Sequence, residues 1–134
     1  MTVAGRISLL VLLFSYSLLS YDLCHANSVD LAYIRNLITS GRAAEAFSML
    51  EPYEFERAGE PQFDYLLGLA ALESGDPARA TVIFERVLAV DPDFLGARLD
   101  MARAHFVLGD RALAKAELET LLSQTPPLMR APRS

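Results

Sequence analysis

Three glycines, Gly41, Gly75 and Gly109, are evenly spaced in this 134-residue chain, each standing 34 positions after the one before it. Other positions repeat at the same interval; they are Ala46, Ala80 and Ala114, then Leu50, Phe84 and Leu118. Repetition of several positions at one period is typical of an array in which each unit buries its apolar face against the next. This period constrains the fold more than any other feature of the sequence.

Each unit is predicted to form two helices joined by a turn. In the second unit, apolar residues recur at spacings of three and four on both sides of Gly75, as in amphipathic helices. Gly75 favours the left-handed backbone that ends a helix, Asp76 is a typical N-cap, and Pro77 fits the first position of the next helix. Asp91 precedes Pro92 and should end that helix. The three predicted units span residues 27–60, 61–94 and 95–126.

The first unit departs from this pattern near its end. Pro52 lacks the N–H that an interior helical position donates, so we expect the second helix of this unit to end near Glu51. Tyr53 and Phe55 are then expected to pack in a linking turn. The acidic residues around this turn are expected to form a solvated edge; they are Glu51, Glu54, Glu56 and Glu60.

The N-terminal segment, 1–26, is expected to be a signal peptide. Arg6 precedes a 13-residue apolar run over residues 7–19, which is shorter than the roughly 20 apolar residues that a membrane-spanning helix needs. Cys24 and Ala26 are small residues at positions −3 and −1 of a cleavage site before Asn27. We therefore expect export, with cleavage after Ala26. An uncleaved membrane anchor and lipidation at Cys24 are the alternatives.

Composition argues against several classes of function. The chain has 12 basic and 17 acidic residues, a net charge of −5 and no basic stripe, so nucleic-acid binding is not expected. One cysteine and two histidines offer few zinc ligands and no disulfide framework. No nucleophile elbow, glycine-rich phosphate loop or HExxH motif is present, so we expect no catalytic residue, cofactor, metal or small-molecule substrate. His105 is expected to be a hydrogen-bonded core residue.

The residues at the helix crossings resemble those of the tetratricopeptide repeat (TPR) family, whose units have the same period. Residues at preferred positions of the family are Tyr33, Ile34, Ala46 and Leu50 in the first unit, Leu67, Gly68, Ala80, Phe84, Val87 and Pro92 in the second, and Met101, Ala102, Ala114, Leu118, Leu121 and Pro126 in the third. The chain departs from the family at Asp64 and Arg98, where a large apolar residue is common. The resemblance implies an all-α, TPR-like α-solenoid over residues 27–126, followed by a short tail at 127–134.

Within this resemblance, the first helices of the units line a concave groove that binds a peptide or a helix of a partner protein. The candidate partner-binding residues are Leu31, Arg35 and Ile38 in the first unit, Tyr65, Leu69, Leu72 and Glu73 in the second, and Leu99, Asp100, Arg103 and Phe106 in the third. The alternative for each of them is an ordinary structural contact, such as an ion pair of Arg103 with Asp100 or Glu73. The residues expected to pack the repeats are Gly68, Ala80, Phe84, Pro92, Ala102, Ala114, Leu118 and Pro126.

A narrower similarity covers residues 94–104, Leu108–Gly109–Asp110 and Pro126–Pro127. This stretch is similar to the repeat domain of surface lipoprotein assembly modifiers, exported bacterial proteins in which an outer-membrane β-barrel follows the repeats. The similarity implies a protein-interaction module in the bacterial envelope, in the periplasm. Two alternatives stay open: a truncated repeat domain of such a lipoprotein exporter, and a subunit that self-associates through an uncapped last helix. The inward-facing residues expected on that helix are Ala114, Leu118, Leu121 and Leu122.

Overall fold

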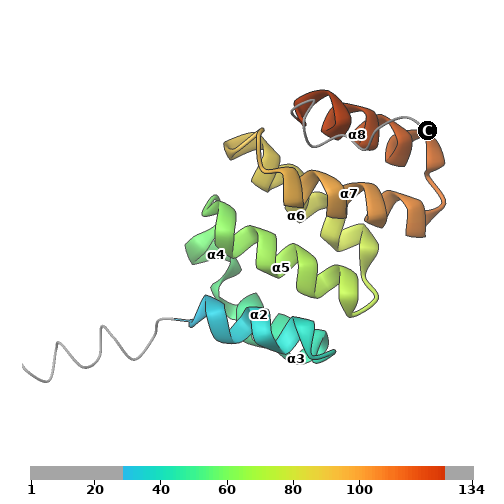
Figure 1. Ribbon diagram of the computed structural model, residues 1–134. Helices are drawn as coiled ribbons and strands as arrows, with labels where there is room; N and C mark the ends of the chain where they lie inside the picture. Colours follow the sequence, from blue (N-terminus) through green and yellow to red (C-terminus); the bar gives the residue numbers. More distant parts are fainter. Residues whose placement is uncertain (1–28, 126–134) are drawn as a thin grey trace, which may run out of the picture. The chain divides into compact units, whose positions relative to one another are not determined.

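The computed structural model describes residues 29–125 (Figure 1). The chain divides into a unit of residues 1–30 and a unit of residues 31–134. The predicted signal peptide at 1–26, Pro126 and the tail at 127–134 lie outside the described residues. The main helices of the second unit are α2 (Leu31–Thr39), α3 (Ala43–Leu50), α5 (Pro61–Glu73), α6 (Pro77–Val90), α7 (Leu95–Leu108) and α8 (Arg111–Gln124).

These six helices pack as three antiparallel pairs, α2 with α3, α5 with α6, and α7 with α8 (Figure 1). Neighbouring pairs are joined where α3 packs on α5 and where α6 packs on α7. The first helices of the pairs also touch in sequence order, because α2 contacts α5 and α5 contacts α7. No strand occurs within residues 29–125. The predicted all-α array of helix–turn–helix units is therefore confirmed.

The turn between α5 and α6 is formed by the residues that the sequence singled out. Gly75 has a φ of +96°, a left-handed backbone that residues with a side chain rarely adopt. Asp76 is the N-cap of α6, and its side chain accepts a hydrogen bond of 3.0 Å from the Arg79 N–H. Pro77 opens the helix. Gly109 repeats the left-handed turn at +87°, but Asp110 makes no capping hydrogen bond with its side chain.

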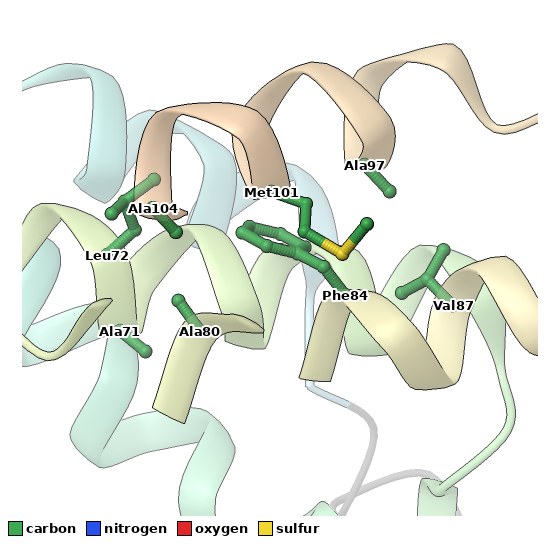
Figure 2. Close-up of a cluster of buried hydrophobic side chains, with 8 residues drawn as sticks. All are labelled: Ala71, Leu72, Ala80, Phe84, Val87, Ala97, Met101 and Ala104. Atoms are coloured by element: carbon green, nitrogen blue, oxygen red, sulfur yellow. The ribbon is translucent and has the colours of Figure 1, made fainter. Parts of the chain in front are cut away.

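A core cluster lies where α7 packs onto α5 and α6 (Figure 2). Phe84 on α6 is fully buried at its centre, and Met101 on α7 lies beside it. A Cβ atom added at Gly68 would stand only 2.7 Å from Cε1 of Phe84. This close approach explains why a residue without a side chain occupies the crossing of α5 and α6.

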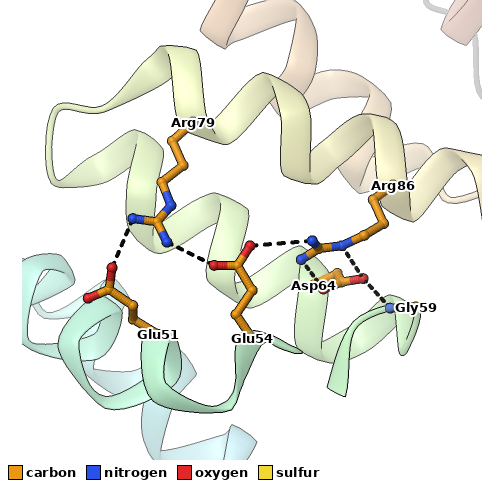
Figure 3. Close-up of polar contacts among 6 residues, drawn as sticks. All are labelled: Glu51, Glu54, Gly59, Asp64, Arg79 and Arg86. Carbon is orange, nitrogen blue, oxygen red and sulfur yellow. Dashed lines mark hydrogen bonds and ion pairs between the residues drawn. The ribbon is translucent and has the colours of Figure 1, made fainter. Parts of the chain in front are cut away.

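The connection between α3 and α5 corrects two predictions. Helix α3 ends at Leu50 as expected from Pro52, and a 3₁₀ turn η1 (Glu51–Tyr53) and a short helix α4 (Glu54–Arg57) follow. Phe55 was expected to pack in this turn, but its side chain is 98% exposed because α4 presents it outward. The acidic edge is not merely solvated either. Arg79 on α6 donates to the Glu51 carboxylate at 2.9 Å and to the Glu54 carboxylate at 2.8 Å (Figure 3).

The two positions that depart from the TPR pattern hold ion pairs inside their own units. Asp64 on α5 is fully buried and accepts hydrogen bonds from Arg86 on α6, at 2.6 and 2.9 Å, and from the Gly59 N–H at 2.8 Å (Figure 3). Arg98, one period later on α7, donates to Glu117 on α8 at 2.9 Å. The same repeat position thus links the two helices of each pair by an ion pair. The first helix supplies the acid in the second unit and the base in the third unit.

Candidate partner-binding face

Four of the predicted groove residues form one chain of polar contacts between α5 and α7. The Tyr65 hydroxyl donates to Asp100 Oδ2 at 2.9 Å, and Arg103 Nη1 donates to Asp100 Oδ1 at 2.6 Å. Arg103 Nη2 donates to Glu73 Oε1 at 2.7 Å. Burial and the charge of Asp100 raise the pKa of Tyr65 to about 12, so the hydroxyl keeps its proton at neutral pH. Hydrogen bonds to Glu73 and Asp100 likewise raise the pKa of Arg103.

These contacts match the structural alternative for Arg103, an ion pair with Asp100 or Glu73, because Arg103 pairs with both. Asp100 is 7% exposed and its oxygens are occupied by Tyr65 and Arg103. The Arg103 side chain is about half exposed. Arg103 and Glu73 therefore offer charge at the surface, while Asp100 fixes the position of Arg103.

The first-unit end of this face contains a groove of about 360 Å³ between α2 and α5. Its lining residues are Leu31, Ala32, Arg35, Gln62 and Leu66. Arg35 is exposed, and no hydrogen bond or ion pair to it occurs among the described residues. An uncompensated cation therefore stands beside an apolar surface at this end.

Three other predicted groove residues are directed into the protein. Ile38 is 8% exposed and Leu72 is 9% exposed, and Leu72 belongs to the core cluster beneath α7 (Figure 2). Leu69 is half-buried and packs against the same cluster. These side chains offer little surface to a partner, because the contacts between successive helix pairs already cover them. Their spacing on a helix resembles that of surface residues, and sequence alone could not separate the two roles.

The third-unit end contains a second groove, of about 280 Å³, between α7 and α8. The predicted residues Leu99, Arg103 and Phe106 line it together with Ala102, Val107, Ala114 and Leu118. Leu118, expected to face inward on an uncapped last helix, is 41% exposed, since no helix packs on this side of α8 within residues 29–125. Val107, which sequence reasoning missed, is 65% exposed.

The remaining packing candidates occupy varied positions. Gly68, Ala80 and Phe84 are buried at the α5–α6 crossing, and Ala102 and Ala114 are buried at the α7–α8 crossing. Pro92 lies two residues after the end of α6 at Val90 and is exposed.

His105 differs from the expectation of a hydrogen-bonded core residue. It is half-buried, and its Nδ1 atom is buried with no hydrogen-bond partner. Glu117 and Glu119, two positions apart on α8, pair with Arg98 and Lys115, respectively.

Over residues 29–125, no three His, Cys, Asp or Glu side chains gather in a way that could hold a metal ion. None of the helices described in that range has the length and apolar character needed to cross a bilayer.

Comparison with known proteins identifies the repeat type. Residues 71–131 match the tetratricopeptide repeat family, a segment that starts near the end of α5 and contains α6, α7 and α8. No curated protein matches the chain. Both the periodic glycine turn at Gly109 and the buried crossing residues Ala80 and Ala114 lie inside the matched segment. Residues 71–131 therefore carry the repeat of the tetratricopeptide repeat family, whose repeats form protein–protein interaction modules and are typically non-catalytic.

Proposed function

We propose that this protein binds a peptide or a helix of an envelope protein along the face formed by α2, α5 and α7. The observation that carries the proposal is Arg35, a cation that makes no hydrogen bond or ion pair among the described residues and lies in a groove beside the half-buried Leu31. A carboxylate of a partner would gain a charge-assisted hydrogen bond at Arg35 and would displace no existing ion pair. Apolar side chains next to that carboxylate would be buried against Leu31.

The polar chain from Tyr65 to Glu73 supports this proposal by holding the middle of the face in one arrangement. The contact of Tyr65 with Asp100 and that of Arg103 with Glu73 both join α5 to α7, so they fix the spacing of the two helices. Binding to a preformed face orders fewer side chains and therefore costs less conformational entropy. We expect the partner to lie across these polar contacts and to place its acidic group at the α2 end of the face.

The proposal places the protein in the bacterial envelope, after export to the periplasm. Its support is the N-terminal sequence, with Arg6 before an apolar run and small residues at Cys24 and Ala26. Intact-mass analysis of the full chain expressed in a bacterial host tests this part. A soluble periplasmic product that begins at Asn27 is expected. A full-length product in the membrane fraction would favour the anchored alternative instead.

Site-specific photocrosslinking in envelope extracts tests the binding face. A photoreactive residue at position 31, beside Arg35, should crosslink to a defined protein, while the same residue at the exposed position 82 on α6 should not. Arg35→Glu should reduce the crosslink at position 31, because it replaces the cation by a negative charge that repels the carboxylate of the partner. Arg111→Glu is the matched control, since Arg111 is an exposed arginine on the second helix of its pair.

Equal yields at positions 31 and 82, or equal losses with the two arginine variants, would contradict the proposed face. The identity of the crosslinked protein separates the remaining alternatives. An outer-membrane lipoprotein would favour the exporter type of function, and a second copy of the chain would favour self-association.

A further inference from the structure

The groove between α7 and α8 is formed by the same repeat positions as a surface one period earlier, between α5 and α6. Another helix of the protein covers that earlier surface. The residues of the groove are Leu99, Ala102, Arg103, Phe106, Val107, Ala114 and Leu118. The residues one period earlier, on α5 and α6, are Tyr65, Gly68, Leu69, Leu72, Glu73, Ala80 and Phe84. Helix α7 packs on that earlier surface, and three members of the set, Leu72, Ala80 and Phe84, are core residues beneath it. The protein therefore contains an example of the element that fits such a groove.

Helix α7 meets the earlier surface through a stripe of two small residues and one long residue. Ala97, Met101 and Ala104 share one face of the helix, at positions i, i+4 and i+7, and each is buried in the cluster with Phe84 (Figure 2). The alanines allow the helix backbones to approach, and the methionine fills the space between them. A helix with this stripe matches the shape of the surface.

We propose that the groove between α7 and α8 binds an amphipathic helix of another protein, with small, large and small apolar residues at positions i, i+4 and i+7. This inference concerns a surface that includes α8 and does not rest on the proposed binding at Arg35. The observation that carries it is the continuation of an existing helix interface by one repeat. The exposure of Phe106, Val107 and Leu118 shows that the surface is uncovered in residues 29–125.

The residues around the groove also specify how the bound helix differs from α7. Helix α7 is held to α5 by two polar contacts, from Tyr65 to Asp100 at 2.9 Å and from Arg103 to Glu73 at 2.7 Å. One period later, Tyr65 is replaced by Leu99 and Glu73 by Val107. A charged side chain that faced either residue would lose water without gaining a partner. The partner helix should therefore carry uncharged residues where α7 has Asp100 and Arg103.

Another copy of this chain fits the groove poorly. Helix α2 has an outward face because it is the first helix of the array within the described residues. Two periods before Met101 and Ala104, this face carries Tyr33 and Asn36, both exposed. The Asn36 amide would be buried against apolar side chains at the place that suits an alanine. The groove thus favours a helix from a different protein.

A designed peptide tests the proposal directly. The probe is a fluorescent peptide of residues 93–109 with Asp100→Ala and Arg103→Ala, and its binding to the purified protein is measured by fluorescence anisotropy. The unaltered peptide and a peptide that also carries Met101→Glu are the controls. The probe should bind at least about tenfold more tightly than either control, because it has the stripe and lacks the two charges.

Variants of the protein place the binding in the groove. Leu118→Glu adds a charge to the α8 wall at a partly exposed position, so the helix array should stay folded, which circular dichroism verifies. This variant should bind the probe at least about tenfold more weakly, whereas Val82→Glu on the exposed side of α6 should leave the affinity unchanged. Equal affinities of the three peptides, or equal effects of the two variants, would overturn the proposal.

The outcome is separable from that of the proposed function. Arg35→Glu should leave binding of the probe unchanged, and Leu118→Glu should leave the crosslink at position 31 unchanged. A dimer of the wild-type protein in sedimentation analysis that Leu118→Glu converts to a monomer would also overturn the proposal, because the groove would then hold a second copy.

Discussion

The buried ion pair between Asp64 and Arg86 should show an asymmetric response to the loss of either partner. The Asp64 side chain is 0% exposed, and its contacts are Arg86 and the Gly59 N–H. Arg86 is 30% exposed and also contacts Glu54 at 3.3 Å. Arg86→Met strands a buried carboxylate, a change that typically costs about 3–5 kcal/mol. Asp64→Ala leaves Arg86 with Glu54 and water and frees only the Gly59 N–H, so we expect about 1–3 kcal/mol.

Urea unfolding followed by circular dichroism at pH 7 measures both costs and that of the double variant. The double variant removes the carboxylate together with its counterion, so its cost should be smaller than the sum of the single costs by about 1–3 kcal/mol. The Met side chain keeps much of the apolar stem of Arg86, which limits the change to the charge. A larger loss for Asp64→Ala than for Arg86→Met, or strictly additive losses, would refute the reasoning.

Two further predictions concern α5. Gly68→Ala should lower the free energy of unfolding by up to about 2 kcal/mol, because overpacking against buried Phe84 costs about 1–3 kcal/mol and the gain in helix propensity returns only about 1 kcal/mol; an unchanged urea midpoint would show that the ring moves aside. Tyr65 should titrate at about 12 by ultraviolet absorbance. Its pKa is raised above that of the unfolded chain, so its stabilising effect is complete below about pH 10 and is lost as the pH rises through about 12; Tyr65→Phe should remove this part of the alkaline loss.

The fold could be predicted from the sequence because local signals and the period agreed. Gly75, Asp76 and Pro77 each favour a different step of the same turn, and the structure has all three steps there. Pro52 marked the end of α3 for the equally local reason that it lacks an N–H. Such signals depend on a few neighbouring residues, so a sequence read without its tertiary contacts contains them.

The binding face was less predictable because one helix stripe serves two purposes. Tyr65 and Leu72 lie two helical turns apart on the same side of α5, yet Leu72 is covered by α7 and Tyr65 bridges to Asp100. Which of them remains exposed depends on the position of the next helix pair. Phe55 was missed for a related reason: an apolar residue between helices was assumed to pack, and the short helix α4 directs its side chain to solvent.

The acidic residues near Pro52 illustrate the limit of reading charge locally. Their partners, Arg79 and Arg86, lie far along the sequence and reach Glu51 and Glu54 only because α6 packs beside the connection (Figure 3). Arg57, the one base within this acidic run, pairs with Glu60, so Glu51 and Glu54 look like a solvated edge in the sequence. The pairing becomes visible once the helices are assembled.

Positions 64 and 98 show what such pairing adds to a repeat array. Both are the same repeat position, and each is bound to the second helix of its own unit, Asp64 to Arg86 and Arg98 to Glu117. If α5 paired with α8, the position equivalent to Arg86 would hold Thr120, and if α7 paired with α6, the position equivalent to Glu117 would hold Ile83. Apolar residues at positions 64 and 98 would fit either partner, whereas a charge that loses its counterion penalises exchange. The departure from the usual apolar residue thus gives each helix a preference for its own neighbour.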